Sequence, residues 1–161
     1  MSGPLDGVRV IDLTTIYSGP IATSILGDHG ADVVKIEAPG GEAMRPGFRQ
    51  RRNGLSGPFA MMNRNKRSLV LDLSGDSGKR VLERLLSGAD VVVENFRPGV
   101  MGRLGFGWDR LQAINSRLIY ASINGVGPTG PYANRRVYDA VIQAISGMAS
   151  LQSDPNSDRP Q

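Results

Sequence analysis

The chain has 161 residues, 40% of them hydrophobic and 21% charged, with a formal net charge of +4. This apolar fraction suffices for one domain with a packed core and excludes a chain that is disordered throughout. Cysteine is absent and His29 is the only histidine, which excludes disulfides, thiol nucleophiles and metal sites built from Cys or from several His. The first residues show neither a signal peptide nor a membrane span, so we expect a cytoplasmic protein.

Strands and helices are predicted to alternate along the chain. Runs of apolar and β-branched residues predict strands at residues 8–13, 32–37, 68–73, 90–94 and 118–123. Helical periodicity and cap signals predict helices at residues 20–26, 98–105, 108–114 and 137–151, and one more that has Ser74 as its N-cap and contains Leu82 and Leu86. Residues 40–66 show no clear period and are expected to form a long loop with one helical turn.

This alternation is typical of a parallel α/β sheet with right-handed crossovers. Ligands bind beyond the carboxyl ends of the strands in such sheets. Four segments are therefore candidates for the site: residues 14–19, 37–41, 95–99 and 124–130. The domain is expected to cover residues 1–152, and residues 153–161 are expected to form a polar tail.

Three motifs fail the structural requirements of the chemistry that they suggest. Gly125–Gly130 has the glycine spacing of a dinucleotide fingerprint, but Pro128 favours a loop where that fingerprint needs the start of a helix. Gly75–Arg80 is similar to a phosphate-binding loop, but its glycines are too close together. His29 stands at a predicted helix end, where a cationic side chain is favourable, and is interpreted as a cap rather than as half of a catalytic triad.

A basic run without acidic residues extends from Arg45 to Arg67. Such a run can serve nucleic acid, a phosphorylated ligand or merely solvent. Only Phe48 and Phe59 accompany it, so there is little aromatic surface for stacking the bases of single-stranded RNA. A solvated loop is preferred and a polyphosphate ligand comes second, while a non-catalytic nucleotide- or RNA-binding fragment stays open as an alternative function.

Several segments together resemble the N-terminal part of family III CoA transferases. This group contains formyl-CoA transferase and carnitine CoA-transferase, and the α-methylacyl-CoA racemases are related to it. The matching segments, whose order and spacing agree over nearly the whole chain, are residues 4–13, 19–20, 26–37, 63–73, 89–99, 118–122, 139 and 143–147. The resemblance implies a Rossmann-like α/β fold, with this chain as the N-terminal portion of the family's large domain, and an interlocked homodimer.

The resemblance also implies coenzyme A or an acyl-CoA as substrate, with no prosthetic group and no metal. Forked arginine donors suit the phosphates of CoA, and apolar or aromatic surface suits its adenine. The positions that match the family's CoA site are Ile16, Tyr17, Ser18, Leu71, Asn95, Phe96, Arg97, Arg103 and Arg136. As alternatives, Phe96 is simply part of the core and Arg103 is a surface charge. Ala38 and Ser74 depart from the pattern, because they replace basic residues found near CoA in some members.

Three further positions bear on the chemistry. Asp139 matches an acidic residue near the reacting thioester that would orient or stabilise charged intermediates, or else it is a carboxylate at a helix N-terminus. Tyr17 replaces a Gln that helps to hold the acyl group in formyl-CoA transferase, so a different acyl substrate is expected. Tyr138 replaces the catalytic His of the racemases and is a poor base with a pKa near ~10, which favours transfer over a racemase-like isomerase.

The function implied is transfer of CoA between an acyl-CoA and a carboxylic acid. Family transferases use an Asp nucleophile, which forms mixed-anhydride and aspartyl-CoA thioester intermediates. That Asp follows shortly after the segment resembling residues 158–161, and neither Asp154 nor Asp158 matches its surroundings. We therefore expect the nucleophile to be absent, and the chain to be truncated before it and inactive as a transferase alone. Membrane and nucleic-acid partners are not expected.

Overall fold

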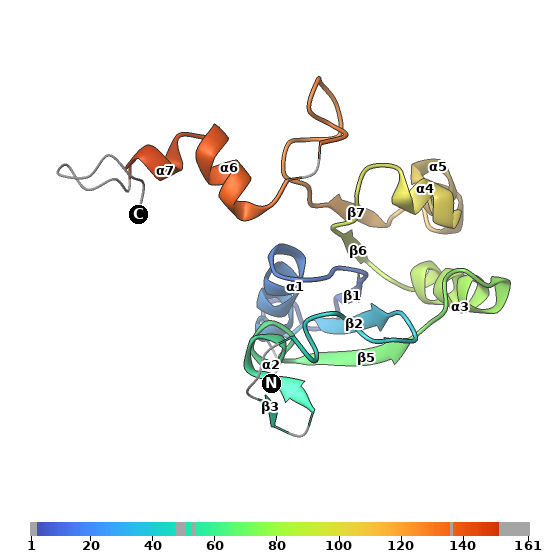
Figure 1. The fold of residues 1–161 in the computed structure, drawn as a ribbon. Helices are drawn as coiled ribbons and strands as arrows, with labels where there is room; N and C mark the ends of the chain where they lie inside the picture. Colours follow the sequence, from blue (N-terminus) through green and yellow to red (C-terminus); the bar gives the residue numbers. More distant parts are fainter. Residues whose placement is uncertain (1–2, 48–50, 53, 136, 152–161) are drawn as a thin grey trace. The chain divides into compact units, whose positions relative to one another are not determined.

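The computed structural model describes residues 3–47, 51–52, 54–135 and 137–151. These residues fall into two compact units, one that ends at Ile123 and one that begins at Asn124. The first unit contains a parallel sheet, whose strands are β1 (Arg9–Asp12), β2 (Asp32–Glu37), β5 (Lys66–Val70), β6 (Val91–Glu94) and β7 (Ile119–Ser122). They lie side by side in the order β5-β2-β1-β6-β7, and every neighbouring pair is parallel (Figure 1).

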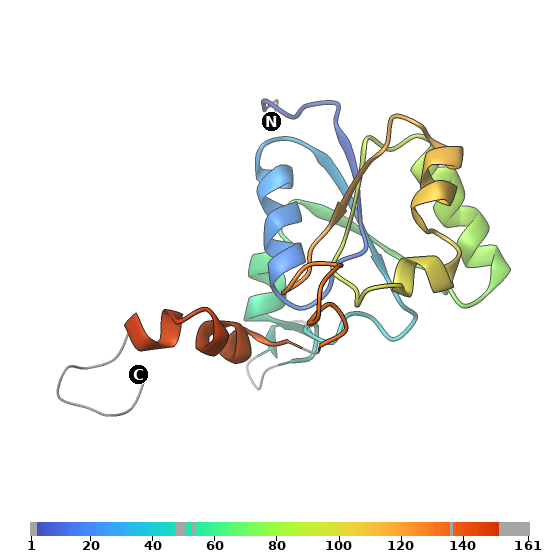
Figure 2. The ribbon, with the colours of Figure 1, turned by 90° about the horizontal axis from the view of Figure 1, so that it is seen from above.

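Helices cover the sheet on both faces. α1 (Ser18–Asp28) and α2 (Gly57–Met62) lie on one face, whereas α3 (Asp76–Ser87), α4 (Val100–Leu104) and α5 (Trp108–Ile114) lie on the other (Figure 2). A short antiparallel pair, β3 (Arg51–Arg52) and β4 (Leu55–Ser56), precedes α2. The first unit is therefore a doubly wound α/β layer structure.

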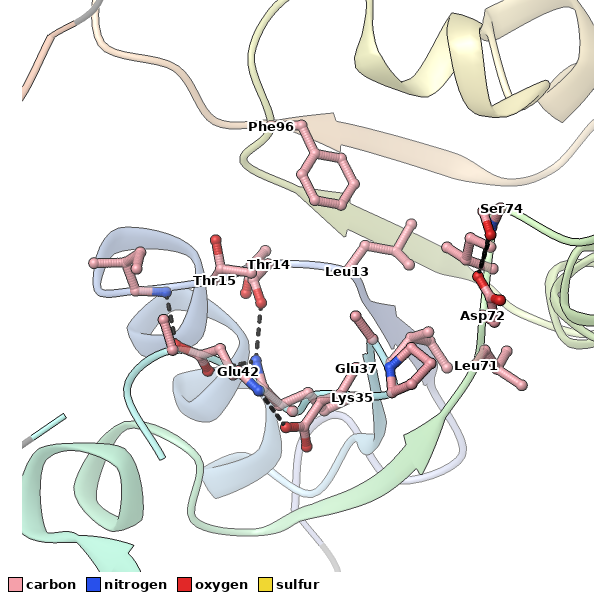
Figure 3. A pocket seen from close by; sticks show the side chains of 17 residues that line it. Leu13, Thr14, Thr15, Lys35, Glu37, Glu42, Leu71, Asp72, Ser74 and Phe96 are labelled. Atoms are coloured by element: carbon pink, nitrogen blue, oxygen red, sulfur yellow. Dashed lines mark hydrogen bonds and ion pairs between the residues drawn. The ribbon is translucent and has the colours of Figure 1, made fainter. Parts of the chain in front are cut away.

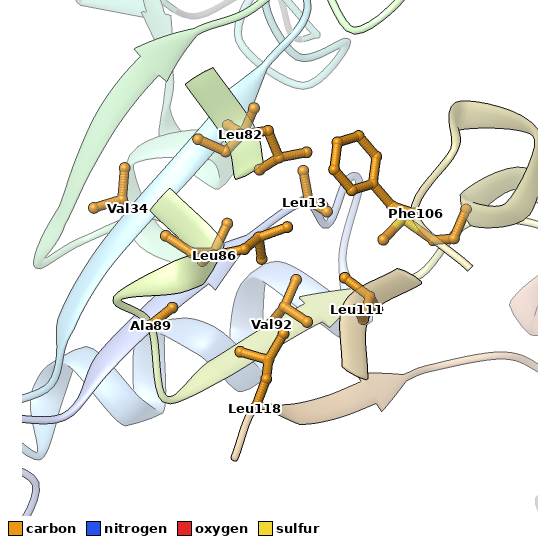
Figure 4. Packing of buried hydrophobic residues seen from close by; sticks show 12 residues of the cluster. Leu13, Val34, Leu82, Leu86, Ala89, Val92, Phe106, Leu111 and Leu118 are labelled. Carbon is orange, nitrogen blue, oxygen red and sulfur yellow. The ribbon is translucent and has the colours of Figure 1, made fainter. Parts of the chain in front are cut away.

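Apolar side chains are buried on both faces of the sheet. The larger cluster joins the strands to α3, α4 and α5, and among its members are Ile11, Val34, Leu82, Leu86 and Val92 (Figure 4). The smaller cluster has as its buried members Val10, Ala31, Val33 and Val93. Successive residues of one strand thus enter opposite clusters, which explains why these strands are continuous apolar runs in the sequence.

The order of the strands creates a crevice beside β1. From β1 the chain moves outward on one side through β2 and β5, and then returns to the other side of β1 with β6 and β7. The chain therefore leaves the adjacent carboxyl ends of β1 and β6 in opposite directions. This reversal is the topological switch point at which doubly wound sheets bind ligands.

The predicted α/β fold is confirmed, and all five strands of the sheet lie where they were expected, with differences of a few residues at their ends. The helix at residues 108–114 has its predicted bounds. The N-cap prediction for Ser74 is wrong, because Gly75 is the N-cap of α3. The Ser74 side chain instead donates to Asp72 Oδ1 at 2.6 Å, and its N–H donates to the same oxygen at 2.9 Å.

The prediction for residues 40–66 missed two short elements. The two strands of the β3–β4 pair lie in this stretch and were not expected, whereas α2 corresponds to the one helical turn that was predicted there without a position. A usable signal was present in the sequence: Ser56 is the N-cap of α2 and accepts a hydrogen bond from the Phe59 N–H at 3.2 Å, and Pro58 occupies the first turn.

The second unit contains α6 (Asp139–Ile145) and α7 (Met148–Leu151). A single helix at residues 137–151 was predicted, but Gly147 interrupts it with φ of +78°, a left-handed conformation that glycine adopts without strain.

Gly125–Gly130 forms no helix, as predicted, so the dinucleotide fingerprint is not built. The predicted tail, residues 153–161, lies outside the described residues, and the predicted domain boundary stays a prediction. Among the described helices, none combines the length and the apolar character needed to cross a membrane.

Candidate functional site

A pocket of about 380 Å³ lies at the carboxyl ends of the strands of the first unit (Figure 3). Its walls follow β1, β2, β5 and β6, and they consist of residues 13–16, 35–39, 41–43, 71–74 and Phe96. Three of the four segments predicted from strand ends contribute to it. The volume and the largely apolar lining are typical of small-molecule sites.

Asn95 joins the ends of β1 and β6 at the switch point. Its Oδ1 accepts the Thr15 N–H and its Nδ2 donates to the Thr15 carbonyl, both at 2.8 Å. Asn95 was predicted to contact CoA, and in this structure both halves of its amide are used to hold the β1–α1 loop. The side chain therefore fixes the distance between two walls of the crevice.

Phe96 and Leu71 provide apolar surface in the pocket, as their predicted role requires. Phe96 also packs against the larger core cluster, so the pocket and the core interpretations both apply. Its N–H donates to Glu94 Oε2 at 2.7 Å, and the Tyr120 hydroxyl donates to Glu94 Oε1 at 2.8 Å. Burial and this carboxylate raise the pKa of Tyr120, which therefore remains a hydrogen-bond donor that orients Glu94.

Glu37 ends β2, at the position where dinucleotide-binding folds use an acid to hold a ribose. Here the carboxylate is already occupied. Arg45 binds both of its oxygens, with Nε at 2.6 Å and Nη2 at 2.5 Å, and Ser68 and the Glu42 N–H add further hydrogen bonds. The guanidinium of Arg45 in turn lies 4.2 Å from the ring centre of Phe59. Glu37 is therefore a structural anchor of the pocket wall and not a free acceptor.

Replacing Glu37 by glutamine is expected to lower stability at neutral pH much more than in acid. Burial alone would raise the pKa of Glu37, but hydrogen bonds from Arg45, Ser68 and the Glu42 N–H outweigh it and lower the pKa from 4.5 to about 2. The stabilising contribution is therefore complete above pH 4.5 and is lost as the pH falls toward 2. At pH 7 the loss should be about 2 kcal/mol, since solvent partly screens Arg45, whose side chain is 30% exposed.

Urea unfolding of the wild type and Glu37→Gln at pH 7 and at about pH 2.5 measures this difference. The gap between their free energies of unfolding should shrink at the lower pH. A gap of equal size at both pH values would contradict a carboxylate that is ionised in the folded state.

Most of the basic run from Arg45 to Arg67 is engaged in ion pairs within the first unit. Besides Arg45, Arg64 pairs with Asp28, Lys66 with Asp12, and Arg67 with Asp32. The acidic partners come from other parts of the sequence. The run contains no acidic residue of its own, but four of its basic side chains are paired in the folded chain. These four cations stabilise the fold. The RNA-binding alternative rested on this basic run, so the evidence for that function is correspondingly weaker.

Arg97 and Arg103 differ from those cations. Both are exposed, one directly after β6 and its wall residue Phe96, the other in the last turn of α4. Within the part of the chain that the structure describes, neither guanidinium has an ion-pair partner. They are thus available for an anionic ligand at this edge of the sheet, which is what their predicted role requires.

The remaining predicted residues are placed as follows. Ile16 lines the pocket, whereas Tyr17 is the N-cap residue of α1, 45% exposed, and Ser18 is the first residue of that helix; neither of these two lines the pocket. Asp139 belongs to the second unit, where it begins α6 and accepts a hydrogen bond from Gln143 Nε2 at 2.5 Å. Arg136 lies outside the described residues. No group of three or more Asp, Glu or His residues in the described ranges is arranged to hold a metal ion.

Sequence reasoning did not single out three buried charged residues of the pocket, although Glu37 begins one of the predicted segments. Lys35, Glu37 and Glu42 are all at least 95% buried, yet they line the pocket. The available signal was the placement of Lys35 and Glu37 beside Val33, Val34 and Ile36 in a strand, where a buried ionised side chain needs a partner. Glu42 lies in a glycine-rich turn, and nothing in its local sequence indicates that it turns inward.

Comparison with known proteins gives a consistent result. A family model described as CoA-transferase family III matches residues 5–161. Formyl-CoA:oxalate CoA-transferase of Rhodopseudomonas palustris (strain BisA53) is 48% identical over 151 residues, which are 93% of this chain and 35% of that protein. The protein of the same description from Streptomyces avermitilis is 47% identical over 150 residues, 93% of this chain and 36% of that protein.

Solved structures agree with these sequence relatives. A CAIB/BAIF family protein from Brucella suis has a TM-score of 0.94 at 40% identity, covering 100% of this chain and 43% of that one. A hypothetical protein from Mycobacterium tuberculosis has a TM-score of 0.88 at 43% identity, covering 99% of this chain and 44% of that one. The chain thus spans about a third of the length of its curated relatives.

Proposed function

The chain belongs to CoA-transferase family III, and we propose that its first unit supplies the CoA pocket of an enzyme that transfers CoA between an acyl-CoA and a carboxylic acid. One observation carries the proposal: the pocket of about 380 Å³ lies at the switch point of the sheet, lined by the predicted CoA contacts Ile16, Leu71 and Phe96. CoA is bound as a substrate and no prosthetic group is invoked. Because the chain spans 35% of the relatives' length, CoA binding is the step assigned to these residues.

The proposed mode of binding follows from the chemistry of the walls. The adenine lies against the apolar surface of Leu71 and Phe96, and the phosphates meet Arg97 and Arg103. The thioester end runs along the main chain of residues 16–18, at the start of α1. Support for this arrangement comes from the lack of ion-pair partners for both arginines within the described ranges, and from the apolar character of the opposing walls.

The acyl group and the partners belong to the same proposal. The relatives named above are formyl-CoA:oxalate CoA-transferases, and Tyr17 stands where formyl-CoA transferase has Gln, so we propose a different acyl group for this chain. Asp139 is retained as an auxiliary group near the thioester, and Arg136 as a CoA contact. A homodimer and a cytoplasmic location complete the proposal, with family membership as their support. No finding favours the racemase-like alternative.

Removing the side chain of either Arg97 or Arg103 is expected to weaken CoA binding. Arg97→Ala and Arg103→Ala should each raise the Kd for CoA roughly tenfold, the loss of one charge-assisted contact to phosphate. The residue that meets the 3′-phosphate should show a smaller loss with dephospho-CoA. Arg117→Ala is a matched control, since Arg117 is exposed but precedes β7, at the amino end of the sheet. Isothermal titration calorimetry measures all three.

The same titrations separate CoA binding from RNA binding. Saturation by CoA at one site supports the proposal. A folded chain that gives no CoA signal, but binds single-stranded RNA with a steep dependence on salt, would contradict it and favour the alternative.

A further inference from the structure

Ile16 adopts a backbone conformation that is unusual for its residue type. Its φ is +70°, in the left-handed region that β-branched side chains rarely occupy. The residue lies in the turn from β1 into α1 and lines the pocket. Strained conformations of this kind persist only where the surroundings determine them, and they concentrate at ligand sites.

Glu42 supplies the contact that holds this residue. The Ile16 N–H donates to Glu42 Oε1 at 2.9 Å, and the glutamate is 5% exposed although it comes from the turn after β2 (Figure 3). The hydrogen bond therefore ties the β1–α1 wall of the pocket to the wall formed by residues 41–43. Buried hydrogen bonds to an ionised acceptor are among the stronger ones in proteins.

Lys35 completes the attachment from the floor of the pocket. Its Nζ lies 3.1 Å from Glu42 Oε2 and donates to the Thr14 carbonyl at 2.8 Å, and its side chain is 2% exposed. Oε2 receives no hydrogen bond of good geometry in the described structure, so the ion pair with Lys35 is what compensates its burial. Two residues of the turn, Thr14 and Ile16, are thus held by one buried ion pair.

Only a carboxylate meets both demands at position 42. One oxygen must accept the Ile16 N–H while the other faces the ammonium of Lys35. A glutamine has a single acceptor oxygen, and its NH₂ group would face either the N–H or the ammonium. The isosteric change to glutamine therefore breaks one of the two contacts while the shape of the side chain is preserved.

We propose that Glu42 is a positioning residue, which with Lys35 holds Ile16 in its left-handed conformation and so presents the main chain of residues 16–18 to the thioester end of CoA. This inference rests on the proposed CoA pocket. Glu42 does not touch the reacting atoms; it acts through Ile16. The proposal assigns a function to a buried pair that would otherwise be a costly way to stabilise a loop.

The test compares the wild type with Glu42→Gln by NMR and by calorimetry with CoA. Amide hydrogen exchange and ¹³C shifts of residues 14–17 report the loop, and the Kd reports the pocket. We expect exchange at Ile16 to accelerate at least tenfold, its shifts to move toward those of extended backbone, and the Kd for CoA to rise about tenfold. Glu83→Gln is the control, because it removes an exposed ion pair with Arg110 outside the pocket.

A second variant covers the case in which Glu42→Gln does not fold. Lys35→Met combined with Glu42→Met leaves neither an unpaired ammonium in the interior nor an acceptor for the Ile16 N–H, and the same loss of protection at Ile16 is expected from it. Unchanged exchange and shifts at Ile16 in the folded variants would overturn the proposal whether or not CoA binds. If the wild type fails to bind CoA while the variants still lose protection at Ile16, the proposed function fails and the anchoring of the loop stands.

Discussion

Asp12→Ala is expected to lower the free energy of unfolding by about 3–5 kcal/mol, a large fraction of the roughly 5–15 kcal/mol that stabilises an ordinary domain. The Asp12 carboxylate is fully buried and lies 2.9 Å from Lys66 Nζ, whose side chain is 2% exposed. Burial lowers the pKa of Lys66, and Asp12 is the charge that opposes this effect. Without the carboxylate, the Lys66 ammonium loses its opposite charge and keeps only neutral acceptors, and two threonine hydroxyls lose an ionised acceptor.

Thermal or urea unfolding measures this loss, and two variants show its origin. Asp32→Ala removes a carboxylate of β2 that is 42% exposed and pairs with Arg67, so it should cost less than about 1 kcal/mol. Asp12→Ala combined with Lys66→Met removes both buried charges and should recover part of the stability. A loss for Asp12→Ala as small as that for Asp32→Ala would show that the buried pair does not hold β1, α1 and β5 together.

Gly19→Ala is the second change with a large expected effect, a loss of about 3 kcal/mol. A Cβ atom at this position would lie 2.3 Å from Thr14 Cβ and 2.5 Å from Thr14 Cγ2. Thr14 has no room to give way, because it is fully buried and its hydroxyl donates to Asp12 Oδ1. The collision would displace the β1–α1 turn, so the variant should also lose affinity for CoA.

Gly102→Ala is the matched control for this prediction. Gly102 lies within α4, and a Cβ there meets nothing within 4 Å. Alanine is the better helix former by about 1 kcal/mol, so this variant should be as stable as the wild type or more stable. Equal stability of Gly19→Ala and the wild type would mean that the tight approach of α1 to the β1 end is not a requirement of the fold.

Sequence patterns predicted the frame of the molecule because that frame depends on local signals. Continuous apolar runs such as residues 91–93 identify strands that are buried on both faces, and the alternation with helices defines a parallel sheet. Leu71 was indicated only by the family resemblance, whereas the rule for strand ends indicated four segments, of which residues 14–19, 37–41 and 95–99 contribute to the pocket. These segments follow from hydrophobic periodicity and from the order of the elements, and both can be read from a single sequence.

Partners that are distant in the sequence could not be predicted in the same way. Lys66 meets Asp12 across 54 residues, and Glu42 meets the Ile16 N–H across 26. No pattern along the chain indicates such pairs, since they depend on how distant segments pack together in the folded chain. The Ser74 prediction was wrong for a local reason: Asp72 accepts both the N–H and the hydroxyl of Ser74, and this turn leaves Ser74 one residue before Gly75, the N-cap of α3.

Binding of CoA in this pocket can be mapped by NMR on the isotope-labelled chain. We expect saturable changes in the amide signals of residues 13–16, 71–74 and Phe96, which line the pocket at the carboxyl ends of the strands. The amino-end residues of the same strands, such as Arg9 and Asp32, should remain unchanged. A folded chain whose pocket signals do not respond to CoA, or whose response is confined to another surface, would contradict CoA binding in this pocket.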